Sequence, residues 1–158
     1  VRRALLLAAA LLLLAPTARA HTITVAVSGD LLIHEPLWTQ ARTASGYDFR
    51  PMLRRVRPLL HRADLAICHV ETPLTAQAPS SFPHFSAPVE LAAAIRRAGF
   101  DACSTASNHT LDRRPDGVRQ TLRALDRAGV AHTGSALARR APLILDVDGV
   151  PVALLAYT

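Results

Sequence analysis

The chain has 158 residues, of which half are hydrophobic and only 4% are aromatic. This composition excludes intrinsic disorder and predicts one domain with an aliphatic core. All 18 basic residues are arginine, and the formal net charge is +6. Three arginines lie in the first 20 residues, so fifteen basic and twelve acidic residues remain. A net charge of +3 on residues 21–158 is too small to indicate a nucleic-acid partner.

The first 20 residues have the pattern of a secretory signal peptide. Arg2 and Arg3 precede an apolar run over residues 5–15, and Ala18 and Ala20 form a small-residue cleavage site. The run is too short to span a bilayer as a helix, which needs about 20 residues. We therefore expect an extracytoplasmic protein, secreted or associated with the cell envelope. Whether the leader is cleaved or retained as an anchor stays open.

The two cysteines, Cys68 and Cys103, each lie in an apolar, strand-like run. Two cysteines cannot form a disulfide scaffold, and buried free cysteine behaves as a small hydrophobic residue. We therefore expect free thiols. A disulfide is the alternative, because export permits it and adjacent parallel strands would bring the two residues close.

Strand-like and helical segments alternate along the chain. Apolar runs over 22–28, 64–70 and 100–106 are typical of strands buried on both faces. A first helix is predicted over about 49–60, and Pro58 is expected to kink or split it. A second is predicted over 88–98 with Gly99 at its end, and a third from Pro115 to Gly129. The βαβαβα order predicts an α/β fold with a mainly parallel sheet.

The C-terminal segment is predicted to be β-structure. A short strand near Val130 is followed by strands over 143–147 and 150–157, and Asp148-Gly149 between them is a hairpin signal. The sequence stops at the end of a strand, which leads us to expect a domain over 21–158 that is truncated at its C-terminus.

Polar residues follow each of the first three predicted strands: Asp30, Glu71, and the pair Asn108 and His109. The carboxyl ends of parallel strands meet at one edge of a sheet, where ligands bind. Two carboxylates, an amide and an imidazole suit divalent manganese, iron or zinc, and two such ions would activate phosphoester chemistry. Three of them singly have a simpler interpretation: Asp30 as a turn or cap, Asn108 as a turn residue, and His109 as a half-buried histidine. Glu71 does not, because a carboxylate at the end of a buried strand needs a partner.

Three further histidines lie near these positions in sequence. His34 is a candidate ligand, with a surface-loop position as the alternative, and His69 is predicted to be a neighbour of Glu71 rather than a ligand. His84 lies in a proline-bounded loop over 81–88 that could cover the site and contact substrate.

The residues before the third helix are also charged. Asp112 is expected to help start that helix. Arg113 and Arg114 are nearest the site and are candidates for binding an anionic substrate. The other arginine clusters, at 54–57, 96–97 and 139–140, are expected to be solvated faces.

An ordered set of short motifs resembles the CapA family of bacterial poly-γ-glutamate capsule-synthesis proteins. The domain of that family looks like the calcineurin-like metallophosphoesterases. The resemblance covers about residues 23–158. The motifs occur at 29–34, 47–49, 63–65, 71–74, 82–85, 98–101, 106–112 and 128–134.

The resemblance implies an α/β/β/α sandwich, of which this chain would be the N-terminal half, and a dinuclear metal site. It implies that Asp30, Glu71 and Asn108 are metal ligands and that His109 protonates a leaving group or stabilises phosphoryl oxygens. The chain departs from the family pattern at His69, where an asparagine is usual, and at Arg114, where a glycine is usual.

Two functions follow as hypotheses. The first is a secreted, metal-dependent, phosphoesterase-like hydrolase acting in envelope polymer metabolism. The second is a non-catalytic envelope module that binds or helps export an anionic capsular polymer, together with membrane-associated capsule-synthesis partners. Because the predicted ligands fill only part of two metal shells, we expect this chain alone to bind metal weakly and to be a poor catalyst.

Overall fold

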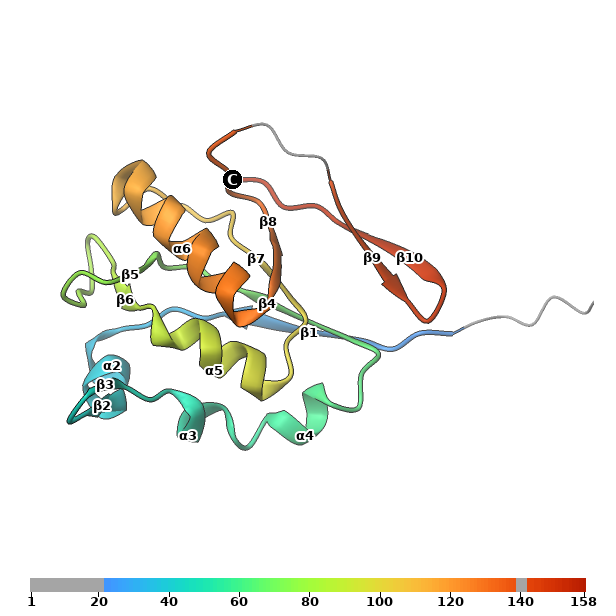
Figure 1. Cartoon of the computed structure of the whole chain (residues 1–158), viewed down its shortest axis with the longest axis horizontal. Helices are drawn as coiled ribbons and strands as arrows, with labels where there is room; N and C mark the ends of the chain where they lie inside the picture. Colours follow the sequence, from blue (N-terminus) through green and yellow to red (C-terminus); the bar gives the residue numbers. More distant parts are fainter. Residues whose placement is uncertain (1–21, 139–141) are drawn as a thin grey trace, which may run out of the picture.

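The computed structural model describes residues 22–138 and 142–158 (Figure 1). The predicted signal peptide and the arginines at 139–140 lie outside these ranges. Within them, no helix has the length and apolar character that crossing a membrane requires.

The centre of the fold is a four-stranded parallel sheet in the order β1-β4-β7-β8. Its strands are β1 (Val25–Asp30), β4 (Leu65–His69), β7 (Ala102–Ser104) and β8 (Ala131–Thr133). The predicted α/β class with a parallel sheet is confirmed. Several strands are shorter than the apolar runs that predicted them.

Two amphipathic helices, α5 (Glu90–Ala98) and α6 (Arg114–Ala128), pack together over one face of this sheet (Figure 1). Both end where predicted, because Gly99 and Gly129 adopt left-handed backbone conformations, with φ of +109° and +71°. Ile95 of α5 and Leu125 of α6 are fully buried in the main core. These helices position the turns that enter and leave β7.

The opposite face of the sheet is covered in part by the hairpin of β9 (Leu143–Val147) and β10 (Val150–Leu154). Successive residues of β4 point to opposite faces. Ala66 and Cys68 therefore join the helix-side core, while Leu65 and Ile67 pack with Val147 of the hairpin. The hairpin forms the second β-layer of the described part of the chain, and the predicted turn has positive φ at both central residues.

The helix predicted over 49–60 is split in two, which is one of the two effects expected of Pro58, although the break falls before that proline. The segment forms two short helices, α3 (Arg50–Leu53) and α4 (Arg57–Leu60), each with a proline in its first turn. Phe49 and Leu60 are buried, but Val56 and Leu59 are exposed. The break explains this, because a new helix begins at Arg57 with Pro58 in its first turn and the apolar face does not continue across the break.

Five short elements were not predicted from the sequence. They are α2 (Glu35–Ala41), the ribbon of β2 (Arg42–Thr43) with β3 (Gly46–Tyr47), and the parallel pair of β5 (Leu74–Thr75) with β6 (Ala87–Pro88). The β5–β6 pair fixes both ends of the loop that contains His84.

The expectation of free thiols is corrected. Cys68 and Cys103 are directly opposite each other on β4 and β7, and the structure joins them as a disulfide. Their Cα atoms are 4.4 Å apart. Pairing of two neighbouring parallel strands in this register, which the sequence alone does not specify, brings the sulfur atoms together.

Candidate functional site

The candidate site lies at the edge of the sheet where the parallel strands end. Asp30 is the last residue of β1, Glu71 follows β4 by two residues, and Asn108 and His109 lie in the turn after β7. Since β1, β4 and β7 are adjacent and parallel, all four residues belong to the same edge.

Asp30 is paired in register with His69 on the neighbouring strand. The Nε2 atom of His69 lies 4.0 Å from Oδ1 of Asp30, whose side chain is 63% exposed. The structure therefore places His69 beside Asp30. The sequence predicted His69 only as a neighbour of Glu71 and did not indicate this contact. The Asp30 carboxylate remains accessible from solvent.

Glu71 is the least satisfied acid at this edge. Its Oε2 atom is buried and has no hydrogen-bond partner among the residues that the structure describes. A small cavity beside Glu71 is lined by Thr105, Thr110 and Ser135. A buried carboxylate oxygen without a donor is costly unless a cation, a proton or a water molecule accompanies it. Glu71 thus has an oxygen available for a ligand.

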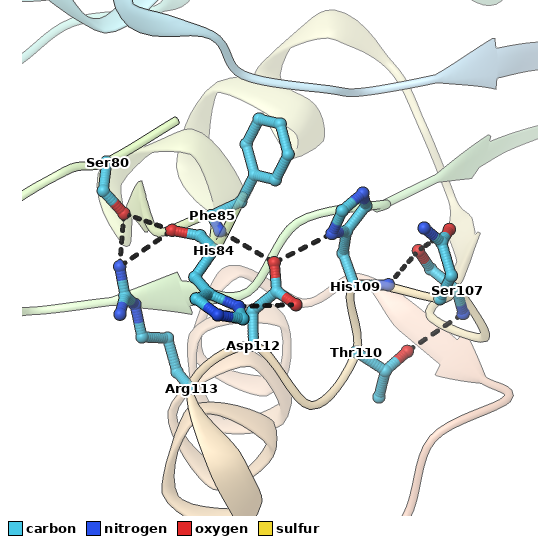
Figure 2. A network of polar contacts seen from close by, with 9 residues as sticks. Ser80, His84, Phe85, Ser107, His109, Thr110, Asp112 and Arg113 are labelled. Atoms are coloured by element: carbon cyan, nitrogen blue, oxygen red, sulfur yellow. Dashed lines mark hydrogen bonds and ion pairs between the residues drawn. The ribbon is translucent and has the colours of Figure 1, made fainter. Parts of the chain in front are cut away.

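Asn108 and His109 lie in a hydrogen-bonded turn, of which Figure 2 labels Ser107, His109 and Thr110. The Ser107 amide donates to Thr110 Oγ1 at 2.9 Å, and Thr110 Oγ1 donates to the Thr105 carbonyl at 2.9 Å. The His109 amide donates to Ser107 Oγ at 3.0 Å. These bonds fix the backbone of the turn, so that Asn108 is presented to solvent and His109 is partly buried.

The His109 imidazole has a carboxylate partner. Its Nδ1 atom lies 2.8 Å from Oδ2 of Asp112, and the two side chains are 16% and 10% exposed. Asp112 also accepts the Phe85 amide at 2.7 Å. The prediction that Asp112 helps to start the third helix is wrong, because α6 has Arg113 at its N-cap and no side-chain cap. The His-x-x-Asp spacing was the available sequence signal for this pair.

The loop before β6 joins the same network. The Phe85 ring lies between two imidazoles, with its centroid 5.0 Å from that of His34 and 4.6 Å from that of His109. His84 is mostly exposed, and its Nδ1 atom lies 3.9 Å from Oδ1 of Asp112. The fold therefore brings His34 and His109, which are distant in sequence, against Phe85, and it places His84 beside Asp112.

Arg113 and Arg114 have different environments. Arg113 donates from Nη2 to Ser80 Oγ and, at 3.0 Å, to the His84 carbonyl, so its guanidinium holds the loop in place (Figure 2). Arg114 is exposed, with φ of +55°, a region that favours glycine. The arginine thus adopts the backbone conformation that the usual family glycine would take easily, and the turn into α6 is retained.

The sequence profile described as bacterial capsule synthesis protein PGA_cap matches residues 24–158. The chain belongs to this family. This confirms the resemblance to CapA proteins. Two curated relatives from Sinorhizobium fredii (strain NBRC 101917 / NGR234), the uncharacterized proteins y4sH and y4uA, are each 28% identical over 119 residues. These matches cover 70% of this chain and 24% of each relative, so the chain spans about a quarter of their length.

Membership of the capsule synthesis family raises the question of whether the residues fit a divalent cation. Within residues 22–138 and 142–158, no three His, Cys, Asp or Glu side chains form a ready metal-binding group. The implied set includes Asn108, which is not one of those types. This set contains two carboxylates and an amide, and Glu71 Oε2 has no hydrogen-bond partner among the described residues. Such oxygen atoms are typical ligands of a divalent cation. The donors fit in kind, but they form only part of a coordination shell.

Proposed function

We propose that this chain provides part of the active site of a metal-dependent, phosphoesterase-like hydrolase that acts outside the cytoplasm on a capsule polymer or its precursors. The observation that best supports the proposal is the pairing of His109 with Asp112. This pair lies at the carboxyl ends of the parallel strands, where Asp30 and Glu71 also lie. A histidine oriented by a carboxylate, at the same end of the strands as candidate cation ligands, is suited to general acid catalysis at a phosphoester.

In this proposal Asp30, Glu71 and Asn108 hold the cation, with His34 as a further candidate ligand. A divalent cation held there would supply Lewis-acid polarisation of a phosphoryl oxygen. Glu71 is the strongest candidate, because its buried Oε2 lacks a donor within the described residues. The exposed Asp30 carboxylate lies one strand away, with its Oδ1 atom 4.0 Å from Nε2 of His69.

His109 is proposed to act through Nε2. Its Nδ1 is engaged by Asp112, so Nδ1 holds its proton and Nε2 is the atom that accepts or donates one. When Nε2 is protonated, it can donate to the oxygen of the leaving group. Phe85 packs against the ring and, with Asp112, restricts its rotation.

The test combines cation binding and turnover on residues 21–158. Calorimetric titration with Mn²⁺ should show weak binding that Glu71→Gln removes, while Glu90→Gln, an exposed acid at the start of α5, leaves it unchanged. With Mn²⁺ and bis(p-nitrophenyl) phosphate, the low turnover should fall about 100-fold or more in His109→Asn. His61→Asn, before β4 at the other end of the strands, is the matched control.

Equal Mn²⁺ binding by the wild type and Glu71→Gln would refute the cation site. Tight binding of two ions by residues 21–158 would instead contradict the expectation of an incomplete shell. Turnover that does not depend on His109 would remove the proposed acid.

A second candidate function is binding of an anionic polymer without turnover. The exposure of Arg114 beside the strand edge favours it. In that case polymer binding should weaken steeply with added salt and should depend on Arg114, whereas Asp30→Ala should have little effect.

A further inference from the structure

A second recess lies away from the candidate site. It is a groove of about 920 Å³ between the α3–α4 segment and the C-terminal end of α5. Its lining includes Asp64 and Asp101, which directly precede β4 and β7. The groove is therefore at the amino ends of the strands, at the opposite end from Asp30 and Glu71. Its volume is within the range typical of ligand sites.

The charge of the groove is unevenly compensated. It is lined by five arginines, 50, 54, 57, 96 and 97, and by three aspartates, 48, 64 and 101. Two of the aspartates pair with arginines, whereas the third accepts a neutral backbone amide and keeps its negative charge, so the lining carries a formal net charge of +2. Asp48 pairs with Arg50 at 2.7 Å, Asp101 pairs with Arg96 at 3.2 Å, and Asp64 accepts the Thr24 amide at 2.7 Å.

The Asp48–Arg50 pair is neutral over a wide pH range. The hydrogen bond from Arg50 lowers the pKa of Asp48 to about 2, so the carboxylate stays ionised and the charge of Arg50 remains compensated. Arg50 and Arg96 are thus occupied by partners within the fold.

The other three arginines are not compensated in this way. Across the part of the chain that the structure describes, Arg54, Arg57 and Arg97 have no carboxylate oxygen within 4.0 Å. Arg57 donates from Nε to His61 at 3.1 Å, and the His61 ring packs closely against Gly99. Two of the three arginines come from the α3–α4 side and one comes from α5, so they face the same recess from two sides.

We infer that this groove binds an anionic chain through its oxyanion groups, with Arg54, Arg57 and Arg97 as the principal contacts. Guanidinium groups bind carboxylates and phosphates through paired, charge-assisted hydrogen bonds. The apolar walls, which include Leu53, Leu60 and Ala94, lower the exposure of such bonds to water. An open groove with separate cationic positions suits an extended ligand with repeated anionic groups better than a single ion.

This inference goes beyond the proposed hydrolase, because it concerns a different surface and needs neither a cation nor His109. The two can fail separately. His109→Asn should abolish turnover and leave groove binding intact. Substitutions of the groove arginines should weaken binding of the anionic chain and leave turnover of a small phosphoester unchanged.

The experiment measures binding of two probes to residues 21–158 at low and moderate salt. One probe is a fluorescent glutamate decamer, which presents carboxylates, and the other is inorganic tripolyphosphate. The triple variant Arg54→Gln, Arg57→Gln and Arg97→Gln should bind the preferred probe at least about ten-fold more weakly than the wild type. Preference for the decamer identifies carboxylate groups as the ligand chemistry, and preference for tripolyphosphate identifies phosphate groups.

The matched control removes the same charge from α6, with Arg119, Arg123 and Arg127 changed to Gln. It should change affinity less than two-fold if the groove, rather than net charge, binds the anion. Equal losses in both triple variants, or no binding of either probe by the wild type, would overturn the inference. Should the groove variant fail to fold, NMR shifts of the arginine Nε–H groups in the wild type decide: probe-induced shifts must map to residues 54, 57 and 97.

Discussion

The Nδ1 atom of His109 lies 2.8 Å from the Oδ2 atom of Asp112, three residues later in the same turn. The same carboxylate oxygen accepts the amide of Phe85, which belongs to a loop 27 residues earlier. Asp112 therefore orients the imidazole and also ties it to the loop that packs against it. In the proposed reaction Asp112 is a positioning residue, since it acts through His109.

Replacing Asp112 with Asn should destabilise the fold and change the tautomer of His109. The Asn side chain carries no negative charge for the Phe85 amide and His109 Nδ1 to donate to. We therefore expect the free energy of unfolding to fall by about 1–3 kcal/mol. Denaturant unfolding measures this loss, and ¹⁵N shifts of the His109 ring report which nitrogen is protonated. Asp116→Asn, an exposed acid in the first turn of α6, should leave the ring shifts unchanged. Unaltered His109 shifts in Asp112→Asn would argue against a positioning role.

Truncating Phe85 should disturb both neighbouring histidines. Its side chain is buried between the rings of His34 and His109, and Phe85→Ala should cost about 3–5 kcal/mol of stability. In the milder Phe85→Leu variant, loss of the ring current should shift the imidazole ¹H signals of His34 and His109 together. Phe82→Leu, at an exposed position in the same loop, is the control. If only one histidine responded to Phe85→Leu, the bridging arrangement would be wrong.

Arg114→Gly should leave the protein as stable as the wild type or stabilise it by up to about 1 kcal/mol. Arg114 has φ of +55°, where a side chain is strained and glycine is not. The control is Arg123→Gly in the middle of α6, which should lower stability by about 1 kcal/mol. Thermal unfolding of both variants makes the comparison. A clear loss in Arg114→Gly would mean that the arginine side chain contributes more than the backbone strain costs.

The Cys68–Cys103 disulfide should be detectable by mass spectrometry under non-reducing, denaturing conditions. Iodoacetamide should add no groups before reduction and two groups after it. In the chain-entropy treatment, closing a loop with a sequence separation of 35 stabilises the fold by about 3–4 kcal/mol. Unfolding with and without reductant tests this size, with a Cys68→Ala, Cys103→Ala double variant as the control. Two adducts in the unreduced protein would show that the thiols are free.

Asp48 should titrate near pH 2 rather than at its ordinary pKa near 3.8, because Arg50 stabilises the ionised form. A lowered folded-state pKa means that the pair stabilises the fold above about pH 4 and that this contribution is lost as the pH falls towards 2. The ¹³C shift of the Asp48 carboxyl follows the titration. In Arg50→Gln its midpoint should return towards 3.8, and an unchanged midpoint would exclude Arg50 as the cause.

Much of the fold was predictable because local sequence specifies local geometry. Gly99 and Gly129 end their helices in left-handed conformations, and Asp148-Gly149 forms the predicted two-residue turn. The apolar runs located the strands of the sheet, and the βα alternation gave their parallel direction. The positions of Asp30, Glu71, Asn108 and His109 at one strand edge followed from that order.

The contacts within the site were decided only by the tertiary structure. Asp112 looked like a helix-starting residue because its partner Phe85 belongs to a distant loop, whose placement depends on the pairing of β5 with β6. The disulfide likewise required β4 and β7 to be neighbours in one particular register. Sequence thus determined the order and ends of the elements, which depend on backbone preferences of a few adjacent residues. Packing of segments far apart in the chain determined which polar side chains meet, because that choice depends on burial and register over the whole domain.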